Sequence, residues 1–197
     1  MPRLFSAFEI PPDVAARLAF FRGGLFGARW VEPEDYHITL RFFGDIDPHT
    51  ARAVDNDLIA TESFFHGQSL HLDFDEISVF GGQQPRALIA RVKPGSGLSR
   101  LQAAHEAIAR RNGLAPETRK FTPHVTLARL RGVEPQAVGA WLSERAYPLA
   151  LSFEAARFAL YSSRDSVGGG PYRIEAVYPF TARDQSPSSA PINGSSR

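Results

Sequence analysis

The chain has 197 residues, of which 43% are hydrophobic and 11% aromatic, a composition that predicts a folded globular protein of one domain. It contains no cysteine, which excludes disulfides, zinc–thiolate sites, iron–sulfur clusters and thiol nucleophiles. Its 22 basic and 21 acidic residues leave a net charge of +1. That balance argues against a protein that binds long nucleic acid duplexes. It favours a small ligand, or the end of a nucleic acid, as the binding partner.

The first half of the chain alternates strand patterns with helix patterns. Prolines at 11 and 12 suit a helix start, and Asp47 followed by proline is typical of a helix N-cap. The expected elements are a strand at Leu4–Ile10, a helix from Pro12 to Gly23, a strand at Tyr36–Phe43, a helix after Asp47, and strands at Leu70–Val79 and Ala87–Val92.

The second half repeats the alternation loosely, so we expect two pseudo-repeat halves of one domain, at about 1–92 and 93–182. The expected elements are a helix capped by Ser96 and closed by Gly113, a strand at His124–Leu130, a helix opened by Pro135, and strands at Leu149–Tyr161 and Tyr172–Phe180. Residues 183–197 are polar and rich in serine and proline, which predicts a disordered tail. Without a signal-peptide pattern or a membrane-length apolar run, we expect a cytoplasmic protein.

One four-residue motif, His-x-Thr-Leu, occurs twice, at 37–40 and at 124–127. Each copy falls inside an expected strand, where residues two apart face the same side. Each motif therefore offers one imidazole and one hydroxyl on a shared face. If the two strands meet, one cleft holds His37, Thr39, His124 and Thr126.

Hydrolysis of a cyclic phosphate requires such a set. One neutral histidine takes a proton from the attacking water, and the other, protonated, gives a proton to the departing ribose oxygen. A histidine pKa of about 6.5 allows both roles close to neutral pH. The threonine hydroxyls can hold the non-bridging oxygens for in-line attack.

Two other interpretations of the motif remain open. A histidine and a threonine on a strand can be purely structural. The pair could also bind a metal, although zinc or iron would need a third ligand. Asp35 lies near His37, but nothing comparable accompanies His124.

These motifs, with their flanks, resemble the two-histidine phosphoesterase superfamily, specifically the LigT-like family of bacterial RNA 2',3'-cyclic phosphodiesterases, also called 2'-5' RNA ligases. The likeness covers about residues 3–180 and is carried by RLFSAFEIP, WVEPEDYHITLRFFGDI, PRALIARV, FTPHVTLAR and LYSSRDSVGGGPYRIEAVYPF. It implies an α+β fold with two lobes of antiparallel sheet, related by a pseudo-twofold axis, with outer helices around a central cleft. It also implies that His37 is the proton donor and His124 the proton acceptor, flanked by Thr39 and Thr126.

The family pattern implies an arginine beside the phosphate after the second motif, and Arg129 occupies that position. Strict alternation, however, puts Arg129 on the face opposite His124, unless the strand is bulged or ends there. The same alternation puts Arg41 on the face of His37. We therefore expect Arg129 to contact the phosphate, and Arg41 is the alternative.

We expect a monomer without metal or other cofactor, acting on RNA ends or nucleoside 2',3'-cyclic phosphates. The resemblance implies a 2'-phosphomonoester as the product. Reverse joining of 2'-5' RNA ends would be a minor activity. The alternatives are a phosphodiesterase of small cyclic nucleotides and a non-catalytic RNA-binding module. Of the remaining histidines, His105 lies on an apolar helical stripe and is expected in the core.

Overall fold

The computed structural model describes residues 3–145, 148–163 and 171–180, so the expected tail lies outside the described residues. The helices are α1 (Pro12–Ala19), α2 (Pro48–Ile59), α3 (Ser96–Arg111) and α4 (Pro135–Arg145), with short 3-10 turns at Pro33–Asp35 and Glu62–Phe65. The strands are β1 (Arg3–Glu9), β2 (Arg29–Trp30), β3 (His37–Asp45), β4 (Leu70–Phe80), β5 (Ala87–Val92), β6 (His124–Arg129), β7 (Ser152–Ala155), β8 (Arg157–Ser163) and β9 (Arg173–Pro179).

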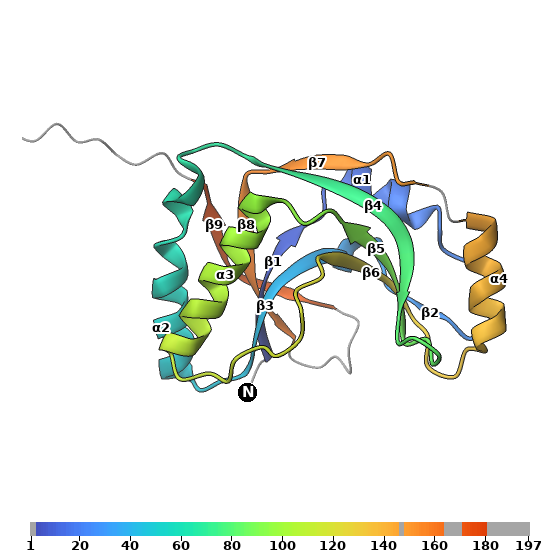
Figure 1. Cartoon of the computed structure of the whole chain (residues 1–197). Helices are drawn as coiled ribbons and strands as arrows, with labels where there is room; N and C mark the ends of the chain where they lie inside the picture. Colours follow the sequence, from blue (N-terminus) through green and yellow to red (C-terminus); the bar gives the residue numbers. More distant parts are fainter. Residues whose placement is uncertain (1–2, 146–147, 164–170, 181–197) are drawn as a thin grey trace, which may run out of the picture.

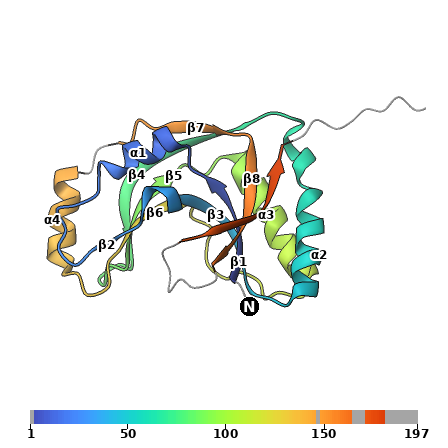
Figure 2. The same ribbon diagram turned by 180° about the vertical axis from the view of Figure 1, so that it is seen from behind.

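The strands form one antiparallel sheet in the order β7-β4-β5-β6-β3-β1-β8-β9, with β2 paired to β6. The helices α2 and α3 cover one end, and α1 and α4 lie toward the other (Figures 1 and 2). The expected α+β fold of antiparallel sheet with outer helices is confirmed. No helix in these ranges is long and apolar enough to cross a membrane.

Apart from β2, which pairs with β6, the sheet divides into two lobes of four strands that meet at the central pair β3 and β6. One lobe is β3, β1, β8 and β9, and the other is β6, β5, β4 and β7. Each lobe therefore combines strands from both halves of the sequence. One of the crossings between lobes is at Ala156, between β7, which pairs with β4, and β8, which pairs with β1.

That crossing corrects one sequence expectation. The run Leu149–Tyr161 is not one strand, because its two parts pair with strands at different places in the sheet. Helix α1 is also shorter than expected, ending at Ala19 rather than Gly23, and the N-cap of α3 is Gly95 rather than Ser96. The N-cap of α2 is as expected, since the Asp47 side chain accepts from the backbone N–H groups of His49 and Thr50.

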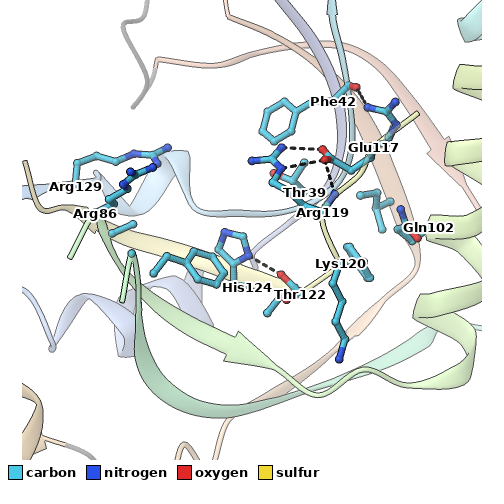
Figure 3. Close-up of a pocket in the computed structure, with 16 residues that line it drawn as sticks. Thr39, Phe42, Arg86, Gln102, Glu117, Arg119, Lys120, Thr122, His124 and Arg129 are labelled. Atoms are coloured by element: carbon cyan, nitrogen blue, oxygen red, sulfur yellow. Dashed lines mark hydrogen bonds and ion pairs between the residues drawn. The ribbon is translucent and has the colours of Figure 1, made fainter. Parts of the chain in front are cut away.

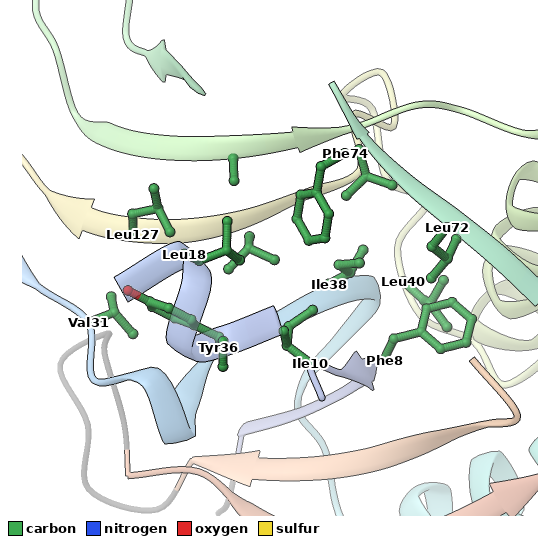
Figure 4. Packing of buried hydrophobic residues seen from close by; sticks show 14 of the residues in the cluster. Phe8, Ile10, Leu18, Val31, Tyr36, Ile38, Leu40, Leu72, Phe74 and Leu127 are labelled. Atoms are coloured by element: carbon green, nitrogen blue, oxygen red, sulfur yellow. The ribbon is translucent and has the colours of Figure 1, made fainter. Parts of the chain in front are cut away.

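The main core lies on the sheet face opposite the motif histidines. Ile38 and Val125 are completely buried there, and Leu18 of α1 and Phe74 of β4 belong to the same cluster (Figure 4). Burial of these apolar residues fixes the register of β3 and β6, because a slip of one residue would turn every side chain to the other face. The core therefore determines which side chains face the cleft.

Candidate active site

The two motifs meet at the centre of the sheet. Ile38 of β3 pairs with Val125 of β6 in an antiparallel register. This register puts His37 opposite Thr126 and Thr39 opposite His124, all four partly exposed while Ile38 and Val125 are buried. The histidines are thus diagonal neighbours, about 7–8 Å apart along the sheet, which leaves room for a phosphate between their rings.

Both histidines are held by the same backbone contact. The Nδ1 atom of His37 lies 2.7 Å from the carbonyl oxygen of Asp35, and Nδ1 of His124 lies 2.7 Å from the carbonyl oxygen of Thr122. A carbonyl can only accept, so each Nδ1 carries the proton and donates it. Each Nε2 then has a lone pair when the ring is neutral and an N–H when it is charged, as a general base and a general acid require.

An aromatic ring meets each histidine edge-on. Tyr172 lies 4.9 Å from the His37 ring and Phe80 lies 4.7 Å from the His124 ring, both at an interplanar angle of 84°. The backbone N–H of Tyr172 also donates to the Asp35 carboxylate at 3.2 Å. Sequence reasoning missed Tyr172, because its approach to His37 depends on the β8–β9 hairpin and no local pattern reports it.

A bulge in β6 resolves the position of Arg129. Leu88 pairs with Ala128 while Ile89 pairs with Thr126, so Leu127 is an extra residue on β6. Leu127 and Ala128 are both buried, and Arg129 returns to the partly exposed face of His124. It lines the cleft with His124 and Thr39, and its Nε atom is buried without a hydrogen-bond partner among the described residues (Figure 3).

A matching bulge in β3 corrects the expectation for Arg41. Ala7 pairs with Thr39 and Ser6 with Arg41, so Leu40 is the extra residue. Arg41 is consequently only 7% exposed. Its Nε atom lies 2.6 Å from Glu106 Oε2 and its NH2 group donates to the carbonyl oxygen of Ala115 at 2.6 Å. The alternation that placed Arg41 beside His37 was wrong, and the guanidinium of this residue is already occupied.

Burial dominates the electrostatics of the histidine pair. Desolvation lowers the pKa of His37 to about 4, helped by the nearby His124 and Arg129, while the Asp35 carbonyl opposes the shift. Desolvation also lowers the pKa of His124, with Arg129 contributing in the same direction. Both rings are therefore neutral at pH 7 until an anion enters the site, because a phosphate favours the charged imidazolium.

The site opens into a cleft of about 510 Å³. Residues from both lobes line it, among them Thr39, Phe42, Phe80, Lys120, His124 and Arg129 (Figure 3). On the same strand as Thr39, His37 lines a smaller hollow of about 130 Å³ with Asp35, Tyr161 and Tyr172. Within the described ranges, no three histidine, aspartate or glutamate side chains gather as metal ligands would.

A family model described as LigT like phosphoesterase matches residues 8–90 and again residues 92–172. The chain belongs to the LigT-like phosphoesterase family. Each match contains one His-x-Thr-Leu motif, and the expectation of a two-histidine phosphoesterase is confirmed.

Individual relatives agree with the LigT-like assignment. A Bacillus subtilis protein named RNA 2',3'-cyclic phosphodiesterase is 31% identical over 140 residues, which is 71% of this chain and 70% of that protein. An Escherichia coli protein of the same name is 29% identical over 133 residues, 64% of this chain and 71% of its own. The crystal structure of E. coli LigT complexed with 3'-AMP shares the fold, with a TM-score of 0.71 at 22% identity, over 92% of this chain and 99% of that one.

Proposed function

We propose that this LigT-like protein hydrolyses 2',3'-cyclic phosphates at RNA ends and leaves a 2'-phosphomonoester. The observation that carries the proposal is the diagonal pair of histidines, each with Nδ1 held by a backbone carbonyl and Nε2 left for proton transfer. The relatives named RNA 2',3'-cyclic phosphodiesterase support the choice of substrate.

In this mechanism His124 is the base and His37 the acid. Nε2 of His124 takes a proton from water as the water oxygen bonds to phosphorus. The bond from phosphorus to O3' breaks, and Nε2 of His37 gives its proton to O3'. The products are a 3'-hydroxyl and a 2'-phosphate. With a ribose 5'-hydroxyl in place of water as the nucleophile, the same displacement of O3' would join 2'-5' ends as a minor activity, because water is present in large excess.

The remaining polar side chains would hold the phosphate. Because Thr126 lies opposite His37 and Thr39 opposite His124, each hydroxyl stands beside one histidine and can donate to a non-bridging oxygen. Arg129 supplies a fixed positive charge, and its Nε–H, which has no partner among the described residues, is available to the phosphate. The anion in turn raises the pKa of both histidines, so that one of them can take up the proton that the acid role requires.

The two sides of the site are not chemically equal, which permits one orientation of the nucleoside. The residue five positions after the first histidine is Phe42, 44% exposed, and the equivalent residue after the second is Arg129. The apolar ring suits contact with a nucleoside, and the cation suits contact with a phosphate. We place the 3' oxygen beside His37 because the family pattern makes His37 the proton donor.

The test is product analysis with three substrates: an oligoribonucleotide ending in a 2',3'-cyclic phosphate, adenosine 2',3'-cyclic phosphate and adenosine 3',5'-cyclic phosphate. We expect turnover of the first two, and phosphorus NMR should identify a 2'-phosphomonoester. A dominant 3'-phosphate would overturn the orientation. Turnover of the 3',5'-cyclic compound alone would favour a small-nucleotide enzyme, and binding without turnover would favour an RNA-binding module.

A further inference from the structure

Three arginines lie around β6: Arg86, just before β5, and Arg129 line the cleft, and Arg29 is the β2 partner of Arg129. Arg29 of β2 pairs directly with Arg129 of β6, so their Cβ atoms are about 4.5–5.5 Å apart. On the other side of β6, the carbonyl oxygen of Arg86 accepts from the backbone N–H of Leu130 at 2.9 Å. Arg86 and Arg129 both line the cleft and are drawn in the same part of Figure 3. We refer to Arg29, Arg86 and Arg129 as the arginine cluster.

The arginine cluster has no protein counter-ion within the described ranges. None of its members forms a salt bridge there, whereas Arg41 and Arg119, in the same cleft, pair with Glu106 and Glu117. Glu117 is the acidic residue that lines the cleft, and its carboxylate is occupied by Arg119 at 2.7 Å. Like charges directly opposite each other in a sheet are destabilising, so an anionic ligand would relieve a repulsion that the described part of the chain does not compensate.

One phosphate group does not account for the whole cluster. Arg129 is near enough to both histidines for its charge to lower the pKa of each, so it belongs with the cyclic phosphate. Arg29 and Arg86 add two positive charges beside it, whereas a cyclic phosphate diester carries a single negative charge. The excess is local, because the whole chain has a net charge of only +1.

We propose that Arg29 and Arg86 bind a second phosphate group of the substrate, the phosphodiester that joins the terminal nucleotide to the one before it. This inference rests on the proposed function and specifies its substrate as an oligonucleotide end rather than a free cyclic nucleotide. The guanidinium group suits the role, since its planar fork donates two parallel hydrogen bonds to phosphate oxygens.

The experiment compares kcat/KM for four substrates. They are adenosine 2',3'-cyclic phosphate, the same compound with a 5'-phosphate, the dinucleotide ApA with a 2',3'-cyclic end, and that dinucleotide with a neutral methylphosphonate linkage. The charged dinucleotide should be preferred over the plain mononucleotide by about tenfold, the worth of one charge-assisted hydrogen bond. The methylphosphonate should lose that preference although its length is unchanged. The mononucleotide with a 5'-phosphate should be preferred over the plain mononucleotide if any second phosphate group suffices. It should show no preference if a phosphodiester is required.

The variants assign the effect to residues. The double variant R29Q/R86Q should bring the dinucleotide-to-mononucleotide ratio of kcat/KM close to one. It should also weaken the salt dependence of that ratio, because added salt screens the attraction between an exposed arginine and a phosphate. The matched control is R111Q, which removes an exposed arginine that pairs with Asp57 on α2, and it should leave the ratio unchanged.

Two results would overturn the inference while the proposed function stands. One is equal kcat/KM for the charged and methylphosphonate dinucleotides, and the other is an unchanged ratio in R29Q/R86Q. Absence of turnover on all four substrates would instead overturn the proposed function, and this inference with it.

Discussion

The two arginines that follow the motifs should have separable effects, which replacement by methionine reveals. Arg41→Met removes the partner of a nearly buried carboxylate, and breaking a buried ion pair costs about 3–5 kcal/mol. Glu106 keeps Arg110 at 2.7 Å and the backbone N–H of Glu117 at 3.2 Å. The loss should therefore be smaller, about 2–3 kcal/mol, which corresponds to a fall in Tm of about 4–12 °C.

Arg129→Met should behave in the opposite way. The Nε atom of Arg129 is buried without a partner in the described part of the chain, so its removal breaks no internal hydrogen bond. The free energy of unfolding should change by no more than about 0.5 kcal/mol. Turnover should fall by about 10²-fold, the effect of losing one preorganised donor to a developing negative charge.

Thermal melting by circular dichroism and kcat/KM on a cyclic-phosphate-ended RNA would measure both effects. Arg129→Lys is the matched control, because lysine keeps the positive charge but not the planar guanidinium with its paired donors. This variant should retain part of the activity. If Arg41→Met abolished turnover at an unchanged Tm while Arg129→Met stayed active, the assignment of the two arginines from the bulges would be wrong.

Further predictions concern protons and metals. The kcat/KM profile should be a bell with its maximum below about pH 6.5, because burial lowers the pKa of both His37 and His124 in the free enzyme; limbs centred above pH 7 would contradict this. The kcat limbs should lie at higher pH, since bound phosphate favours the imidazolium. EDTA should leave turnover unchanged, and a loss restored by a divalent cation would indicate a metal site. The free energy of unfolding should decrease as the pH falls below about 6.5. Burial lowers the pKa of His105 to about 3 in the folded protein, so His105 takes up a proton in this pH range only when the chain is unfolded. His105→Asn should reduce that slope in urea titrations, and an equal slope would refute the argument.

The face on which the motif side chains lie could be predicted from the sequence because it is a local property of each strand. Alternation along a strand correctly put His37 with Thr39 and His124 with Thr126 on one exposed face, over buried Ile38 and Val125. The expected core position of His105 is also found, since it is completely buried and its Nδ1 lies 2.8 Å from Ser6 Oγ. That the motif strands are neighbours required the resemblance, because strand order is a long-range property.

The predictions failed where the backbone departs from regular geometry. The bulges at Leu40 and Leu127 exchange the faces that strict alternation gives to Arg41 and Arg129, and a hydrophobic pattern does not specify where an extra residue is inserted. The break at Ala156 was missed for a similar reason. The residues around it keep a strand-like pattern while their partners change from β4 to β1.

The most direct test of the two-histidine mechanism is turnover of an RNA 2',3'-cyclic phosphate by His37→Ala, His124→Ala and the double variant. Each single variant should be slower by about 10²–10⁴-fold, the usual contribution of one general acid or base. The double variant should be little slower than either single one, because both groups act in one step. Circular dichroism should remain native. A near-wild-type rate in either single variant, or effects that multiply in the double variant, would contradict the account.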